Sequence, residues 1–251
     1  MKNFIFAIVL FFTIQLFPQN QDSVSFKTEL DELTILGSIR ADDNSPISKN
    51  WKYIPDIVKP YFMKKIVLVG PESTGKTVLS EKLSDFYGTK IIPEYGREYV
   101  ENLKSLNKEL SLRDFDYIAL GHIEMAQKIA AENIKENFNN KMLIFDTDVM
   151  TTKIWSEIFC GESSYYVNSL EEHYIQKGDL YLLMDIDVPW IDDGLRFPDA
   201  IRKWHFNRIK KELIDKNLKY HIISGNYDKR LYKVLNKIDS FRVSNGLNNK
   251  N

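Results

Sequence analysis

Gly70-Pro71-Glu72-Ser73-Thr74-Gly75-Lys76-Thr77 is a complete G-x-x-x-x-G-K-[ST] motif. It follows the apolar run at residues 66–69 and precedes residues 78–87, where apolar side chains recur at helical spacing. A buried strand, a glycine-containing loop and a helix, in that order, are the context that this motif requires. Its glycines let successive backbone N–H groups turn inward and bind phosphate oxygens. The motif therefore predicts a nucleoside triphosphate site.

Two side chains of this loop have specific expected roles. Lys76 is predicted to contact the β- and γ-phosphates of ATP, and the Thr77 hydroxyl is predicted to bind Mg²⁺. The other residues of the loop assigned to the nucleotide are Gly70, Glu72, Ser73, Thr74 and Gly75. The alternative is an ordinary glycine turn between a strand and a helix. Four fixed positions in the right structural context favour the phosphate site over that alternative.

Composition limits the class of protein. At 251 residues the chain suits one α/β domain with an appendage, or two small domains. Lysine and arginine total 34 against 35 acidic residues, and no basic block stands out, which argues against a surface for nucleic acid. Cys160 is the single cysteine, which excludes an intrachain disulfide and fits a reducing compartment.

The first 62 residues differ in character from the rest. Residues 1–21 contain Lys2 followed by an apolar run, as in a secretory signal or membrane anchor. The run is shorter than the roughly 20 residues of a membrane-spanning helix, and no small-residue cleavage pattern follows it. A signal or anchor, a packed segment and a start codon placed too far upstream all stay open. Residues 22–62 are predicted to be a linker or remnant, whose aromatic residues near its end pack against the following domain.

Strands and helices alternate over residues 63–244. Strands are predicted near residues 66–69, 90–92, 142–146, 180–184 and 220–223. Helices are predicted near residues 78–87, 99–106, 112–137, 149–159, 164–176, 199 onward and 228–242. This order predicts a three-layer α/β/α P-loop fold with a five-stranded parallel sheet and right-handed crossovers. Residues 245–251 are expected to be a disordered tail.

A carboxylate and a guanidinium follow the second predicted strand, in the sequence PEYGRE. Open α/β sheets bind substrates beyond the carboxyl ends of their strands. Glu94 is therefore predicted to accept a proton from a substrate hydroxyl or to hold it in line, and Arg97 to bind phosphate or orient Glu94. The alternative is a solvated ion pair in the first turn of a helix.

Acidic residues also end the third predicted strand. Asp146 closes a continuous apolar run and is placed to hold Mg²⁺, directly or through water. Asp148 follows on the loop, where it either binds substrate hydroxyls or caps the next helix. His122 lies on a buried helical stripe and is predicted to be a hydrogen-bonded interior or cleft residue rather than a metal ligand.

The segment at residues 185–198 is charged and contains glycine and proline. It is predicted to fold over the triphosphate as a lid, bringing Arg196 or Arg202 against the charge of the transferring phosphoryl group. An ordinary surface loop with solvated arginines is the alternative. After the last strand, the turn that contains Asn226 and Tyr227 is predicted to contact adenine.

Several motifs together resemble those of the ribosylnicotinamide kinase domain of the NadR family. They are GPESTGKT, PEYGRE, ALGH at residues 119–122, FDTD at residues 145–148 with the TT that follows, and WIDDGLR at residues 190–196. The resemblance covers about residues 64–237. Residues 51–62 also resemble the segment that joins this kinase to an adenylyltransferase domain in bifunctional members. The HxGH-type motif of that second domain is absent from the chain, so no adenylyltransferase activity is expected.

The resemblance implies ATP- and Mg²⁺-dependent phosphorylation of the 5′-hydroxyl of a small nucleoside, ribosylnicotinamide, in NAD salvage. It places Glu94, Asp146 and Asp148 around the ribose and the metal, and Arg196 in the lid. Family members often carry an aromatic residue before EYGRE that stacks on the nicotinamide ring, and this chain has Pro93 there. Phe115 and Tyr95 are the candidates to replace it.

Three alternatives stay open from the sequence. The enzyme could act on another nucleoside, or the chain could be a nucleotide-dependent regulatory ATPase that acts on a protein partner. A weaker alternative is an exported or membrane-tethered protein with a vestigial nucleotide site. Because ATP is scarce outside the cytoplasm, a cytoplasmic location is predicted, with membrane association or export through residues 1–21 as the alternative. The sequence does not set the oligomeric state.

Overall fold

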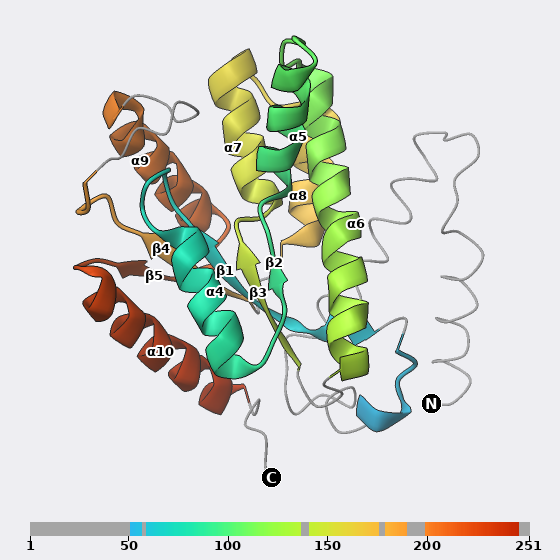
Figure 1. The fold of residues 1–251 in the computed structure, drawn as a ribbon, viewed down its shortest axis with the longest axis vertical. Helices are drawn as coiled ribbons and strands as arrows, with labels where there is room; N and C mark the ends of the chain where they lie inside the picture. The colour runs from blue at the N-terminus through green and yellow to red at the C-terminus, as the bar shows by residue number, and fades with distance from the viewer. Residues whose placement is uncertain (1–50, 57–58, 137–140, 176–178, 190–198, 246–251) are drawn as a thin grey trace.

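The computed structural model describes residues 51–56, 59–136, 141–175, 179–189 and 199–245 (Figure 1). The predicted leader, residues 22–50 of the predicted linker, the loop that contains Arg196, and residues 246–251 of the predicted tail lie outside the described residues. Among the residues that are described, no helix combines the length and the hydrophobicity that a membrane span needs.

In the described part of the chain, five strands form one parallel sheet in the order β2-β3-β1-β4-β5. They are β1 (Lys64–Val69), β2 (Ile91–Ile92), β3 (Met142–Asp146), β4 (Leu180–Met184) and β5 (Lys219–Ile223). Every residue of β1, β3 and β4 is buried, as expected of parallel strands covered on both faces. The sheet confirms the predicted five-stranded parallel arrangement.

Helices cover both faces of this sheet (Figure 1). They are α4 (Lys76–Tyr87), α5 (Tyr95–Ser105), α6 (Leu112–Glu136), α7 (Val149–Cys160), α8 (Tyr165–Tyr174), α9 (Asp199–Asp215) and α10 (Tyr227–Ser244). The largest difference from prediction is the start of α5, which begins at Tyr95 rather than near residue 99. Glu94 is therefore the N-cap residue of a helix and not part of a longer loop.

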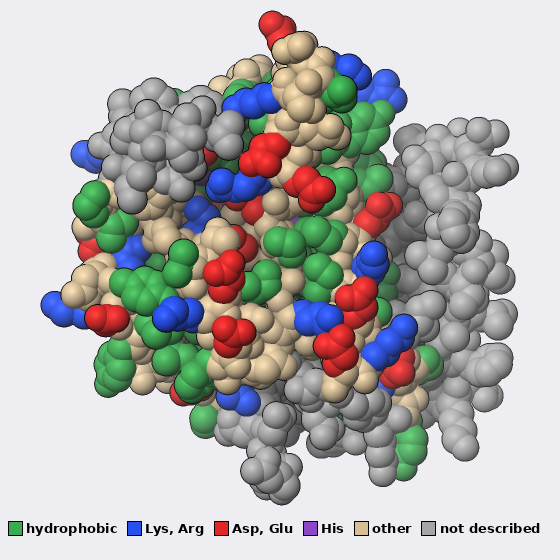
Figure 2. Space-filling view, viewed as in Figure 1, with side chains coloured by type: hydrophobic (Ala, Val, Ile, Leu, Met, Phe, Trp, Pro, Cys, Tyr) green, Lys and Arg blue, Asp and Glu red, His purple; other side chains and the backbone are tan. Residues whose placement is uncertain are grey.

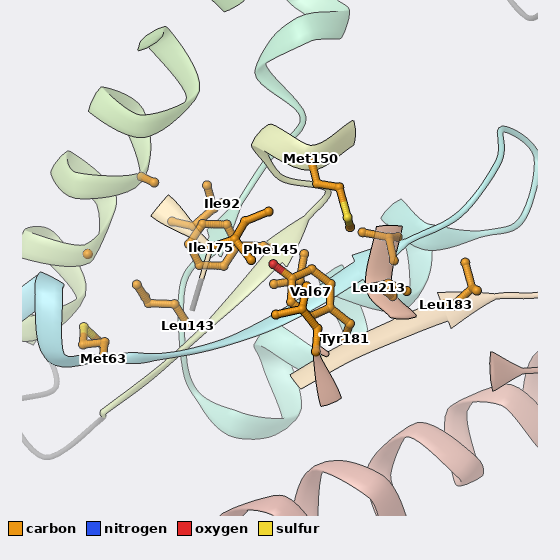
Figure 3. Close-up of a cluster of buried hydrophobic side chains, with 14 of the residues drawn as sticks. Met63, Val67, Ile92, Leu143, Phe145, Met150, Ile175, Tyr181, Leu183 and Leu213 are labelled. Atoms are coloured by element: carbon orange, nitrogen blue, oxygen red, sulfur yellow. The ribbon is translucent and has the colours of Figure 1, made fainter. Parts of the chain in front are cut away.

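Alternation along the strands divides the core into two layers. On one face, Ile66 and Leu68 of β1 pack with side chains of α4 and α10. On the other face, Val67 and Val69 pack with side chains of α6, α7 and α9, as part of the cluster shown in Figure 3. The result is the three-layer α/β/α arrangement that the sequence predicts.

The segment before β1 belongs to the second of these layers. Two short 3₁₀ helices, η1 (Trp51–Tyr53) and η2 (Lys59–Phe62), precede the first strand. Trp51, Ile54 and Phe62 are buried in the same cluster as Val67. The expected packing of this segment against the domain is confirmed for Trp51 and Phe62, whereas Tyr53 is 66% exposed.

A third cluster lies between α6, α7 and α8. It contains Phe115 and Ile118 of α6, Val149 of α7, and Val167 of α8, with Tyr95 of α5 packed against it. These helices extend away from β2 and β3 in Figure 1. They therefore build a helical wall next to the carboxyl ends of the strands.

A buried ion network joins α9 to α7 and α8. Lys153 Nζ of α7 donates to Glu212 Oε1 of α9 at 2.8 Å and lies 3.3 Å from Glu171 Oε2 of α8. Arg208 donates to Glu157 and, at 2.6 Å, to Glu212. Burial raises the pKa of Glu171 to about 7. Burial also opposes the ionisation of Glu212, but hydrogen bonds from Lys153 and Arg208 lower its pKa to about 2.

Candidate active site

The loop at residues 70–77 joins β1 to α4, and its backbone requires glycine at two points. Gly75 is the N-cap of α4 with φ 78°, a left-handed conformation that glycine adopts without strain. Gly70 has φ 146°, and a Cβ atom there would lie 2.9 Å from the carbonyl oxygen of Met184. Glycine at position 70 thus lets the loop pass close to the end of β4.

Two side chains of the loop donate hydrogen bonds to the loop's own backbone. Lys76 Nζ donates to the carbonyl oxygens of Gly70 and Pro71, each at 2.9 Å. Thr74 Oγ1 donates to the same Pro71 oxygen at 2.7 Å. Lys76 therefore reaches back over the loop from the first turn of α4, and its contact with the phosphates of ATP stays a prediction.

Thr77 and Asp146 meet at the carboxyl ends of β1 and β3. The Thr77 hydroxyl donates to Asp146 Oδ2 at 2.6 Å. The register that pairs Leu68 with Asp146 brings them together, and the Thr147 N–H continues that pairing by donating to the Leu68 oxygen at 3.0 Å. Asp146 Oδ1 is buried and has no hydrogen-bond partner within the described ranges.

This pair fits a magnesium site. Mg²⁺ prefers oxygen ligands and is usually bound by one or two carboxylates together with substrate phosphates and water. A buried carboxylate with an unsatisfied oxygen, next to a hydroxyl, is that donor set. No cluster of three or more His, Cys, Asp or Glu side chains positioned for a metal occurs among the described residues, so a metal at this place would take its remaining ligands from phosphate or water.

Beside the loop lies a pocket of about 700 Å³, a volume typical of sites for small molecules. It is formed by α5, α6 and α7, and Glu72 of the phosphate loop contributes to its wall. The lining residues are Glu72, Glu94, Tyr95, Gly96, Arg97, Val100, Glu101, Leu103, Lys104, Lys108, Glu109, Leu110, Phe115, Ile118, His122, Thr147, Thr151, Thr152, Trp155 and Phe159. Figure 2 shows acidic and basic side chains mixed on this face of the molecule, with no large area of a single charge.

Charged side chains lie at the outer part of this pocket. Glu94 precedes the first turn of α5 without making a capping hydrogen bond, and its Oε2 lies 3.4 Å from Arg97 Nη2. The Glu94 side chain is 25% exposed and that of Arg97 is 47% exposed, so the ion pair is solvated and weak. Glu94 and Arg97 therefore form the ion pair that was the alternative interpretation, and both also line the pocket, so their roles at a substrate stay predictions.

Aromatic side chains of α5, α6 and α7 form part of the pocket wall. The ring of Phe115 lies 5.9 Å from that of Phe159, which lies 6.0 Å from the ring of Trp155. Tyr95 packs against α6 at Gly121, where a Cβ atom would lie only 2.4 Å from its ring. Both aromatic residues proposed from the sequence, Phe115 and Tyr95, thus line the pocket.

Four residues of α7 line the pocket, Thr152 among them, and none was given a role from the sequence. Thr151, Trp155 and Phe159 follow one another at intervals of four, which places them on one face of a helix. That spacing after the FDTD motif is the signal that identifies them in retrospect. His122 of α6 lines the same pocket, but the predicted hydrogen bond of its side chain is not seen for Nε2, which has no partner in the part of the chain described.

Asp148 is part of the structural frame. Its side chain caps α7 by accepting from the Met150 N–H at 3.1 Å, and it accepts from the Tyr181 hydroxyl at 2.7 Å. It is 3% exposed, does not appear in the pocket lining, and burial raises the pKa of its carboxyl. The helix-cap alternative is confirmed, whereas a contact of Asp148 with substrate hydroxyls stays a prediction.

Of the residues predicted to contact ATP outside the phosphate loop, the structure describes Asn226, Tyr227 and Arg202. Asn226 caps α10 by accepting from the Lys229 N–H at 3.1 Å, and Tyr227 follows it with about a third of its surface exposed. Arg202 is buried on α9 and donates to the Val188 oxygen at 3.1 Å. Arg196 lies outside the described residues. The predicted contacts of these residues with ATP stay predictions.

Arg230 of α10 is a residue that the sequence interpretation missed. Its guanidinium donates to the carbonyl oxygens of Thr74 at 2.8 Å, Gly225 at 2.7 Å and Asp185 at 2.9 Å, and it pairs with the Asp187 carboxylate. Arg230 is 3% exposed. It therefore ties the phosphate loop to the segments that follow β4 and β5.

A three-layer parallel α/β fold, with a phosphate loop after its central strand and a nucleoside-sized pocket beside that loop, defines a P-loop nucleoside-triphosphate-binding protein. The chain belongs to the AAA domain family, whose model matches residues 65–230.

Sequence and structure comparisons agree on the same relatives. The chain is 31% identical over 238 residues to the trifunctional NAD biosynthesis/regulator protein NadR of Salmonella typhimurium, covering 91% of this chain and 55% of that protein. A crystal structure of a NadR protein in complex with NR matches with a TM-score of 0.60 at 19% identity, covering 77% of this chain and 55% of the other. A NadR complex with NAD and AMP-PNP matches with a TM-score of 0.57 at 19% identity, over 77% of this chain and 53% of the other. The chain thus spans about half the length of these relatives.

Proposed function

We propose that this protein is an ATP-dependent kinase that transfers a phosphoryl group to the 5′-hydroxyl of a nucleoside, ribosylnicotinamide, and so forms nicotinamide mononucleotide for NAD salvage. One observation carries the proposal. A single pocket extends from Glu72 of the phosphate loop to Glu94, Arg97 and an aromatic wall. A donor phosphate and an acceptor nucleoside bound there would be adjacent, as direct phosphoryl transfer requires.

The relatives support the choice of substrate. The Salmonella protein is described as acting in NAD biosynthesis, and solved NadR proteins hold NR in one case and NAD with the ATP analogue AMP-PNP in another.

Each residue group has a defined task in the proposed reaction. Lys76 and the backbone N–H groups of the loop neutralise the charge of the transferring phosphoryl group. Glu94, at the pocket edge, orients the acceptor hydroxyl and takes its proton. Thr77 and Asp146 would hold Mg²⁺, which in such enzymes neutralises charge on the phosphates.

A regulatory ATPase is less well supported, since it has no need of a pocket beside its phosphate loop that is lined by a carboxylate such as that of Glu94. Because the proposed reaction consumes ATP, we expect the enzyme to act in the cytoplasm.

The test is an ADP-release assay with ATP·Mg²⁺ and a panel of nucleosides that includes ribosylnicotinamide. We expect turnover with ribosylnicotinamide well above the rate without an acceptor, and a product that gains one phosphate by mass spectrometry. ADP release that does not depend on any nucleoside would instead indicate an ATPase. Turnover with a different nucleoside alone would keep the kinase and change its acceptor.

A further inference from the structure

Two buried polar groups that line the pocket have no hydrogen-bond partner in the part of the chain that the structure describes. His122 Nε2 and Thr151 Oγ1 are both buried and lack a hydrogen bond among the described residues. Their residues are 3% and 4% exposed, respectively, and both line the pocket. Buried polar atoms in folded proteins are almost always hydrogen-bonded, because leaving one unpaired costs free energy. Two such atoms in one pocket indicate a ligand that supplies the missing hydrogen bonds.

The surroundings of these two groups are otherwise apolar. His122 lies 6.1 Å from the ring of Phe145, and the pocket wall nearby includes Phe115, Ile118 and Trp155. Burial lowers the pKa of His122 to about 3, with the charge of Lys65 acting in the same direction. The imidazole is therefore neutral near pH 7, with one ring nitrogen as a donor and the other as an acceptor.

The outer part of the pocket is slightly acidic. Its charged lining residues are Glu72, Glu94, Glu101 and Glu109 against Arg97, Lys104 and Lys108. Aromatic faces attract cations, and a neutral histidine does not repel them. An acidic entrance, an aromatic wall and an uncharged polar end are together suited to a flat cationic ring that carries a neutral polar substituent.

We propose that His122 and Thr151 are specificity-determining residues that bind the carboxamide of a pyridinium nucleoside at the inner end of the pocket. This inference rests on the proposed function and adds the residues that select its acceptor. A carboxamide offers an N–H₂ donor and a carbonyl acceptor, and an imidazole nitrogen together with a hydroxyl can satisfy both. A nucleoside without that group leaves both buried atoms unpaired, which is the most effective basis for rejecting an analogue.

The test measures binding by calorimetry without ATP, so that it does not depend on catalysis. The ligands are ribosylnicotinamide and pyridinium riboside, which lacks only the carboxamide. The proteins are the wild type, His122→Phe, Thr151→Val and the control His221→Phe, which removes a partly buried histidine of β5 outside the pocket. Circular dichroism and thermal unfolding verify that each variant is folded.

We expect the wild type and the control to bind ribosylnicotinamide at least about tenfold more tightly than pyridinium riboside. In each pocket variant this preference should fall several-fold, through weaker binding of ribosylnicotinamide and unchanged binding of pyridinium riboside. If folded His122→Phe and Thr151→Val variants keep the full preference, the inference is wrong. It is also wrong if the wild type shows no preference or binds neither ligand.

The ADP-release assay separates this inference from the proposed function. Carboxamide-selective binding without phosphoryl transfer would refute the kinase and leave the inference standing. Phosphoryl transfer to ribosylnicotinamide, with the binding preference unchanged in both variants, would support the kinase and refute the inference.

Discussion

At the scale of single residues, the site depends on a few charged groups placed at one edge of the sheet. Lys76 reaches back over its loop, and Asp146 retains one buried oxygen without a hydrogen-bond partner among the described residues. Both arrangements are suited to a triphosphate with its metal. Each can be tested by one substitution.

Lys76→Ala should abolish turnover, because it removes the ammonium that faces the transferring phosphoryl group. Losing one such group commonly costs about 10²–10³-fold in rate. ADP release under saturating ATP measures the effect. Glu81→Ala, an exposed position on the same helix, is the control and should keep wild-type activity. Substantial kinase activity in Lys76→Ala would refute the role given to Lys76.

Asp146→Asn should weaken the dependence of activity on Mg²⁺. The amide keeps the shape of the side chain and its contact with Thr77, but it lacks the negative charge that attracts a hard cation. Activity measured against Mg²⁺ concentration should therefore shift to higher concentrations. A metal titration identical to that of the wild type would count against a metal site at this pair.

At the scale of secondary-structure elements, the site is held by contacts between loops and helices. Arg230 of α10 connects three loops, and the network around Glu212 connects three helices. Neither group lines the pocket. Both can affect activity only by positioning the groups that do.

Arg230→Met should raise the KM for ATP more than the KM for the nucleoside. The substitution leaves the carbonyl oxygens of Thr74, Gly225 and Asp185 without their shared donor, so the phosphate loop loses its support while the acceptor pocket does not. Steady-state kinetics with each substrate varied in turn will measure the two effects. Arg242→Met is the control, since the Arg242 guanidinium lies 3.8 Å from Asp239 and 5.0 Å from the ring of Tyr87, and neither contact involves the phosphate loop. Equal changes in both KM values would indicate a general structural role.

Glu212→Gln should destabilise the protein near pH 7 by roughly 1–3 kcal/mol, because it leaves the partly buried cations Lys153 and Arg208 short of a counter-charge. The pKa of Glu212 in the folded protein is lowered from its ordinary value of 4.5 to about 2. The ionised carboxylate therefore stabilises the folded state above about pH 4.5, and this stabilisation is lost as the pH falls from about 4.5 towards 2. Denaturant unfolding at several pH values should show a smaller difference between wild type and variant in acid.

Asp215→Asn is the control for the ion network. Asp215 pairs with Lys211 on the same helix, but both side chains are more than half exposed, so the loss should stay within about 1 kcal/mol. A loss of similar size in the two variants would show that the buried network has no special weight.

At the scale of the whole molecule, the parallel topology gathers the site at one edge. The phosphate loop, Asp146 and the loops joined by Arg230 all follow the carboxyl ends of strands, where open α/β sheets bind ligands. The helical wall of α5, α6 and α7 then encloses the acceptor side. The segment before β1 adds Trp51, Ile54 and Phe62 to the core cluster that contains Val67.

Trp51→Ala should destabilise the whole domain by about 3–5 kcal/mol, the usual loss for a buried large aromatic side chain. Trp51 is 5% exposed and belongs to the same core cluster as Val67 and Phe145. Thermal unfolding of the full chain will show a lower midpoint. Tyr53→Ala, which removes a neighbouring aromatic residue that is 66% exposed, should have little effect. An unchanged midpoint for Trp51→Ala would mean that this segment is not part of the stable fold.

Much of this protein follows from local patterns. The motif at residues 70–77, the apolar strands and the acid at the end of β3 predict the sheet, the phosphate loop and the Thr77–Asp146 pair, because strand, turn and helix signals act over short distances. The resemblance to the NadR family rests on the same short motifs. The start of α5 was the least accurate boundary.

Long-range contacts decided the rest. The Tyr181 hydroxyl donates to Asp148, and Arg230 donates to the carbonyl oxygens of Thr74 and Asp185, which are more than 40 positions away. Neither contact leaves a pattern in nearby residues, whereas the cap that Asp148 provides to α7 is local and was predicted as an alternative. The inner end of the pocket also depends on contacts between distant parts of the chain. His122 and Thr151 come from two helices that meet only once α6 and α7 are packed, so their shared lack of partners is visible only in the folded chain.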